Sequence, residues 1–96
     1  MNILSSGTKN KEDIFISLSE NDNDKLILKI TGEKVDLFKN DIYNTIMKVA
    51  NAYNIGGVTF EVEYYGAWNF TIAARTESLI RKYLQKRSIG LWNLEV

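Results

Sequence analysis

Cysteine and histidine are both absent from this chain of 96 residues. Without cysteine, no disulfide can hold the fold and no thiol can act as a nucleophile. Without histidine, Ser-His-Asp and Cys-His nucleophile pairs are excluded, and so are zinc sites built from His and Cys. A carboxylate pair or an oxygen-ligand metal site remains open, but the two absences disfavour a free-standing enzyme.

An excess of charge of one sign and a long apolar run are also missing. Lys plus Arg number 12 and Asp plus Glu number 12, which gives zero net charge, whereas nucleic-acid binders usually carry a basic excess. No apolar run approaches the roughly 20 residues of a membrane-spanning helix. Polar residues follow residues 1–4 at once, unlike in a signal peptide. We therefore expect a cytoplasmic protein that binds neither nucleic acid nor membranes.

The overall composition, with 45% hydrophobic and 25% charged residues, is typical of one globular domain. Residues 1–12 are polar and show no periodicity, which predicts a flexible N-terminal arm. Residues 13–96 are then expected to form a single α/β domain of the carrier type described below.

Periodicity divides this domain into strands and helices. Alternating apolar residues predict strands over residues 13–18, 25–31, 58–62 and 68–74, with a reversal at Tyr65-Gly66. A long helix is predicted between the two strand pairs because six apolar residues recur three or four apart: Val35, Phe38, Ile42, Ile46, Val49 and Tyr53. A last helix follows Thr76, and Leu91, Trp92 and Leu94 are expected to pack back on the body.

The predicted order ββαββα indicates an α+β fold. Two hairpins that are each followed by a helix favour a two-layer sandwich. We expect a four-stranded, mainly antiparallel sheet with two helices on one face.

Two segments in the second half of the chain resemble a known family. Residues 53–58 are Tyr-Asn-Ile-Gly-Gly-Val, and residues 66–77 begin Gly-Ala-Trp-Asn and end Ala-Arg-Thr-Glu. The citrate lyase gamma subunit, whose family includes the malonate decarboxylase carrier subunit, has a similar Tyr-Asn-hydrophobic-x-Gly-Val turn, Gly-Ala-Leu-Asp and Ala-Arg-x-Glu. The two patterns agree without a gap from Asp13 to Glu77. The resemblance also implies a structural pairing of Arg75 with a carbonyl or carboxylate.

The resemblance implies a non-catalytic acyl carrier subunit. In this family a serine near the N-terminus carries 2'-(5''-phosphoribosyl)-3'-dephospho-CoA, a phosphopantetheine-like prosthetic group whose thiol holds the acyl group. The implied partners are citrate lyase-like alpha and beta subunits, or other acyl-transfer enzymes.

The carrier serine is not matched in the ungapped comparison. The family's Gly-(Thr/Ser)-Leu-Glu-Ser-x-Asp pairs with residues 7–13, which puts Lys11 at the serine position. A second alignment sets residues 4–7 against Leu-Glu-Ser-Gly and makes Ser6, or the neighbouring Ser5, the attachment site. Two functions therefore stay open. The chain is a carrier with a prosthetic group, or a carrier-fold protein without one that acts as a binding or assembly module.

Two further groups of side chains have a functional and a structural interpretation. Glu61 and Glu63 share a face of their predicted strand and could bind a cation or exchange protons, although a solvated sheet face is the plainer account. An aromatic set could form a surface for a partner or pack in the core: Tyr64, Tyr65, Trp68 and Trp92.

Overall fold

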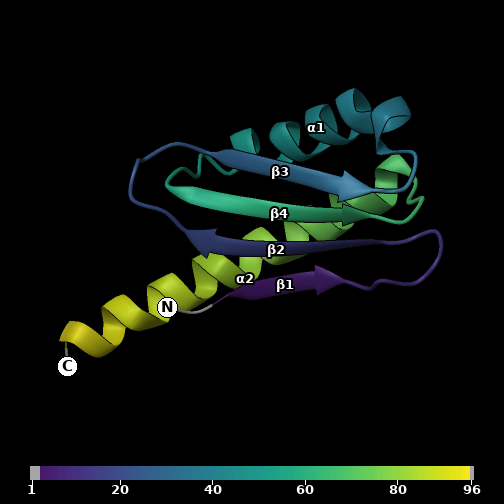
Figure 1. Ribbon diagram of the computed structural model, residues 1–96. Coiled ribbons are helices and arrows are strands. Elements are labelled where there is room, and N and C mark those ends of the chain that lie inside the picture. Colours follow the sequence, from purple (N-terminus) through teal and green to yellow (C-terminus); the bar gives the residue numbers. More distant parts are fainter. Residues whose placement is uncertain (1–2, 96) are drawn as a thin grey trace.

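The computed structural model describes residues 3–95, and within the last helix it describes side chains as far as Arg87. Four strands and two helices make up the fold (Figure 1). In chain order they are β1 (Leu4–Gly7), β2 (Ile14–Glu20), β3 (Ile27–Gly32), α1 (Val35–Ala52), β4 (Val58–Tyr64) and α2 (Asn69–Glu95).

The strands form one mixed sheet in the order β1-β2-β4-β3. The pairs β1–β2 and β2–β4 are antiparallel, whereas β3 and β4 are parallel. The parallel pair follows from the chain order, because α1 carries the chain from the end of β3 back to the start of β4. Both helices lie on the same face of the sheet, which confirms the predicted α+β fold of four strands and two helices (Figure 1).

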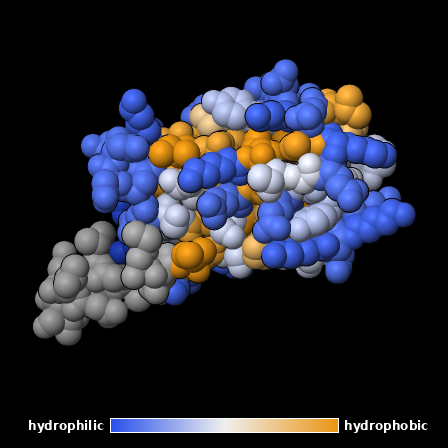
Figure 2. Space-filling view, in the orientation of Figure 1, coloured by the Kyte–Doolittle hydropathy of each residue, from blue (hydrophilic) through white to orange (hydrophobic). Residues whose placement is uncertain are grey.

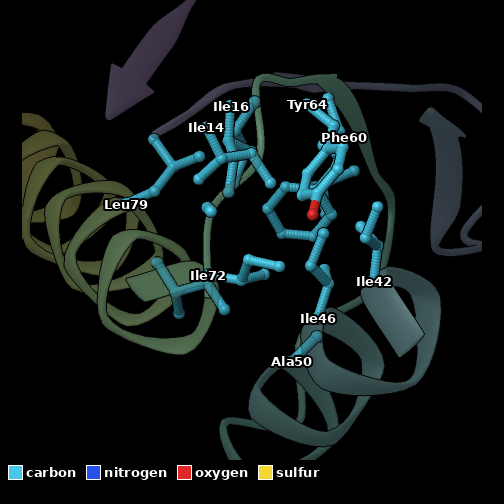
Figure 3. Close-up of a cluster of buried hydrophobic side chains, with 14 of the residues drawn as sticks. Ile14, Ile16, Ile42, Ile46, Ala50, Phe60, Tyr64, Ile72 and Leu79 are labelled. Carbon is cyan, nitrogen blue, oxygen red and sulfur yellow. The ribbon is translucent and has the colours of Figure 1, made fainter. Parts of the chain in front are cut away.

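The core lies between the sheet and this pair of helices. Alternate residues of β4 are buried, from Val58 through Phe60 and Val62 to Tyr64, and they point toward the helices. Figure 3 shows Phe60 and Tyr64 between side chains of the two helices, among them Ile46 and Ile72. Burial of each such large apolar side chain contributes about 1.5–3 kcal/mol, so this cluster supplies most of the driving force for folding.

The observed order of elements is βββαβα and corrects the predicted ββαββα at two places. The first is the segment predicted as an arm. Residues 4–7 form β1, which pairs with β2 from Leu4 opposite Leu18 to Gly7 opposite Phe15. Leu4 packs against the core, so this short segment is held by backbone pairing as well as by apolar contact.

The second correction is at residues 68–74, which begin α2 and form no strand. Trp68 and Phe70 are exposed, whereas Ile72 and Thr76 are buried. Burial therefore follows helical spacing, which continues through Leu79, Ile80 and Tyr83. A helix puts these residues in one stripe against the sheet and α1, which a strand followed by a turn could not do.

The C-terminal residues continue α2 as far as Glu95. The predicted packing of Leu91, Trp92 and Leu94 concerns side chains outside the described part of the molecule. Within the described residues, no helix combines the length and the apolar character that crossing a membrane requires.

Candidate functional site

The loop of residues 8–13 joins β1 to β2 and contains Lys11, the residue that the ungapped comparison set against the family's carrier serine. Lys11 is exposed in this loop. The loop lies beside the β4–α2 connection, because the Glu12 amide donates to the Tyr65 carbonyl (2.7 Å) and the Tyr65 amide donates to the Asp13 carbonyl (3.0 Å). Lys11 is thus an exposed side chain on a loop whose backbone is held at the two residues that follow it.

Asp13 holds the loop closed. Its carboxylate accepts hydrogen bonds from the Thr8 hydroxyl (2.6 Å), the Ile14 amide (2.7 Å) and the Arg75 guanidinium (2.8 and 3.2 Å). Burial raises the pKa of Asp13, but the hydrogen bonds and the charge of Arg75 outweigh burial and lower the pKa from 3.8 to about 2. Arg75 therefore has the structural carboxylate partner that the resemblance implied.

The hydroxyl groups near this loop differ in access. Ser6 is only 7% exposed and lies opposite the buried Ile16 on the inner face of the sheet. Ser5 is exposed and lies opposite Ser17 on the outer face, and its carbonyl accepts a hydrogen bond from Lys82 Nζ (3.2 Å). The Thr8 hydroxyl is used within the loop, since it donates to Asp13 and accepts from the Asn10 amide. Of Ser5 and Ser6, only Ser5 presents its side chain to solvent.

A groove lies next to the loop, at the carboxyl ends of the parallel strands β3 and β4. The cavity that contains Lys11, which we call the outer cavity, has a volume of about 490 Å³ and is lined by Lys11, Glu33, Lys34, Phe38, Tyr64, Tyr65 and Gly66. The neighbouring cavity, which we call the inner cavity, has a volume of about 410 Å³ and is lined by Phe38, Asp41, Ile42, Tyr64, Gly66, Ala67, Trp68, Asn69, Phe70 and Ile72. The rings of Phe38 and Tyr64 contact each other at 5.9 Å between centroids and belong to both cavities. We call the two cavities together the end groove.

The end groove contains most of the predicted aromatic set. Tyr64, Tyr65 and Trp68 line it, whereas the Trp92 side chain lies outside the described part of the molecule. The sequence analysis missed Phe38 and Phe70, which it assigned to a buried helix stripe and a strand. Both are exposed, at 41% and 75%. The sequence contained a signal for the exposure of Phe70. Phe70 does not share the helical spacing of the buried residues that begin at Ile72.

Glu61 and Glu63 lie on the outer face of β4, away from the end groove. Glu63 accepts a hydrogen bond from the Tyr65 hydroxyl (2.9 Å), which raises the pKa of Tyr65, and it pairs with Lys9 at 3.6 Å. Figure 2 shows hydrophilic residues on this face of the sheet, with hydrophobic ones between them. Within the described residues, no group of three or more His, Cys, Asp or Glu side chains is placed to hold a metal ion. The solvated-face interpretation therefore fits this pair better than a proton-transfer site.

Comparison with known protein families finds a match over most of the chain. The acyl carrier (ACP) family described as malonate decarboxylase delta subunit (MdcD) matches residues 3–83. The match covers all four strands, α1 and the first half of α2, and it includes the loop with Lys11. The chain belongs to this malonate decarboxylase delta subunit family of acyl carrier proteins.

Proposed function

We propose that this chain is a carrier-fold subunit that works as a binding or assembly module, without a covalent prosthetic group on its β1–β2 loop. The observation that carries the proposal is the exposed Lys11 at the position of the family's serine. A lysine has no hydroxyl to esterify, so the modification of the family cannot take place at this residue.

The contacts of the loop support the ungapped pairing with the family motif. Gly7, Thr8 and Asp13 match the family's Gly, Thr or Ser, and Asp, and each has a role in closing the loop. Gly7 has φ +89° and packs against the Ile14 carbonyl, where a side chain would clash. Thr8 binds Asp13, and Asp13 binds Arg75. An alignment that treats residues 8–12 as an insertion keeps Asp13 opposite the family's Asp, but it leaves Thr8, which binds Asp13, without a match.

The burial of Ser6 also weighs against a covalent carrier. Its side chain faces inward from β1, a strand that contacts α2 as well as β2. A transferase would have to separate β1 from α2 to reach the hydroxyl. The bulky group would then prevent the strand from returning to its place in the sheet.

A second candidate function is a carrier that is loaded at Ser5. The observation that favours it is the exposure of Ser5 on the outer face of β1. The prosthetic group would then extend from a paired strand instead of from a loop. In either case family membership supports partners of the acyl-transfer type, namely lyase-like or decarboxylase-like subunits.

Intact mass spectrometry separates the two functions. The chain and its Lys11→Ser variant are each expressed with a transferase for phosphoribosyl-dephospho-CoA, and a citrate lyase gamma chain in the same cells shows that the transferase is active. We expect no mass increase for the natural chain and an increase for Lys11→Ser, because the substitution restores a hydroxyl on an exposed loop. A mass increase of the natural chain that disappears in Ser5→Ala, but persists in Ser6→Ala, would establish the second function instead.

A further inference from the structure

We propose that the end groove binds a small amphipathic anion without a covalent bond. Its anionic group, of the carboxylate kind, lies beside Lys11 and Lys34, and its apolar body lies against Phe38, Trp68 and Phe70. This inference rests on the proposed function, since it names the class of ligand that the binding module takes.

The position of the groove is the first argument. The chain leaves β3 and β4 at the same end of the sheet and turns at each place into a helix, α1 or α2. Both connections, β3–α1 and β4–α2, therefore begin at this end, and side chains from each of them line the groove. The two cavities, of about 410 and 490 Å³, fall within the usual size of small-molecule sites, about 300–1,000 Å³.

The distribution of charge orients the ligand. The outer cavity contains two cations, Lys11 and Lys34, and one carboxylate, Glu33. The inner cavity contains one carboxylate, Asp41, and no cation. Within the described part of the chain, neither Lys11 nor Lys34 takes part in an ion pair. An anionic group is therefore stabilised in the outer cavity and repelled from the inner one.

The start of α1 adds to the positive potential of the outer cavity. Lys34 occupies the N-cap position with φ +57°, and its side chain makes no capping hydrogen bond. The first amides of α1 thus lack the side-chain acceptor that Ser, Thr, Asp or Asn would supply. The partial positive charge of the helix N-terminus favours an anion here, although Asp36 in the first turn offsets part of it.

The inner cavity suits an apolar body. Ile42 and Ile72 form buried lining, each 1% exposed, while Trp68 and Phe70 remain 67% and 75% exposed. Large apolar side chains left in contact with water gain free energy when a ligand covers them. An aromatic ring or a short acyl chain would cover Trp68 and Phe70 while its anionic group stays with the two lysines.

The test is a titration of ¹⁵N-labelled protein followed by NMR, with 4-phenylbutyrate as the probe. We expect saturable shifts of the amides of Gly66, Ala67 and Asn69, and weaker or no shifts with the matched cation 4-phenylbutylamine. Acetate, which has the charge but no apolar body, should shift none of them at the same concentration.

The Lys11→Gln/Lys34→Gln double variant should bind on the order of tenfold more weakly, because each exposed charge contributes a few-fold. The control is Lys25→Gln/Lys29→Gln, which removes two lysines outside the groove and should bind as the natural chain does.

Four outcomes would overturn the proposal. Equal binding of the amine and the acid would show that the lysines do not select an anion. Unchanged binding in the Lys11→Gln/Lys34→Gln variant would show the same. An absence of saturable shifts with the acid would show that the groove does not take this class of ligand. A concentration-dependent dimer that Phe70→Ser abolishes would assign the groove to a second copy of the chain. None of these results changes the expected outcome of the mass spectrometry. A failure of the ligand proposal can therefore be distinguished from a failure of the proposed function.

Discussion

Asp13 connects the β1–β2 loop to α2 through a single carboxylate. Its pKa of about 2 lies below the ordinary value of 3.8, which means that the folded protein favours the charged form. The contribution to stability is complete above pH 3.8 and is lost as the pH falls through about 2. The shift corresponds to about 2 kcal/mol for a side chain that is 12% exposed.

We predict that Asp13→Asn lowers the free energy of unfolding by about 2 kcal/mol at pH 7. The difference from the natural chain should shrink toward pH 2, where the natural carboxylate is also becoming protonated. Urea unfolding at a series of pH values measures both quantities. Asp22→Asn in the exposed β2–β3 loop controls for the loss of one negative charge. A difference that stays constant between pH 7 and pH 2 would contradict the ion pair with Arg75.

Gly7 is a second single residue on which the loop depends. It has φ +89°, and an added side chain would clash with the Ile14 carbonyl, which is backbone and cannot turn away. Gly57 is a matched control because it has φ +69° but no atom closer than 3.9 Å to an added Cβ. We predict that Gly7→Ala destabilises the fold by more than about 2 kcal/mol and Gly57→Ala by about 1 kcal/mol. Equal unfolding midpoints in urea would show that the clash is relieved by movement of the loop.

At the scale of elements, the first turns of α2 are where sequence pattern and structure differ most. Residues 68–74 alternate between large apolar and smaller or polar residues, which is a strand pattern. The same residues also fit a helix once Thr76 is counted with the apolar series, because its hydroxyl donates to the Ile72 carbonyl (2.7 Å) and can be buried. Because Thr76 is polar, the helical pattern of buried residues was not recognised in the sequence.

The helical assignment predicts unequal costs for two apolar truncations. Ile72 is buried and Phe70 is 75% exposed, so Ile72→Ala should cost about 3 kcal/mol and Phe70→Ala less than about 0.5 kcal/mol. Urea unfolding followed by circular dichroism measures both variants. In a strand that packs on the core, Phe70 and Ile72 would share a face and both truncations would be costly, so two large effects would contradict α2 at this position.

The elements that could be predicted from the sequence are those whose periodicity and end signals agree. The buried residues Ile42 and Ile46 follow the helical spacing of α1, and Asn54 after this helix has φ +52°, the left-handed conformation expected near a helix end. In β4 the alternation of Val58, Phe60 and Val62 matches burial residue by residue.

By contrast, β1 has only four residues and two serines, so its pattern is too short and polar to be recognised. Lys11 was therefore predicted on a flexible arm, whereas it lies on the loop between β1 and β2, and the end groove was not predicted either. The groove forms only when β3 and β4 lie parallel, a pairing that no local pattern indicates.

At the scale of the whole molecule, β1 connects the N-terminal part of the chain to β2 and α2. It pairs with β2 along one edge and contacts α2 on the inner face of the sheet. Lys82, far along α2, donates to the Ser5 carbonyl at 3.2 Å. The N-terminal residues thus cover part of the core that the rest of the chain would leave open to water, and this role differs from that of a flexible arm.

We predict that deletion of residues 1–7 lowers the free energy of unfolding on the order of 3 kcal/mol, because it removes the backbone pairing with β2 and exposes apolar side chains beneath α2. Deletion of residues 1–3, which leaves β1 intact, is the matched control and should have little effect. Urea unfolding measures both truncations, and hydrogen exchange of the Ser6 amide in the intact chain gives an independent readout. If both deletions leave stability unchanged and the Ser6 amide exchanges freely, residues 1–12 behave as an arm, and Ser6 becomes accessible to a transferase after all. The stability of β1 therefore also decides which of the two serines a prosthetic group could reach.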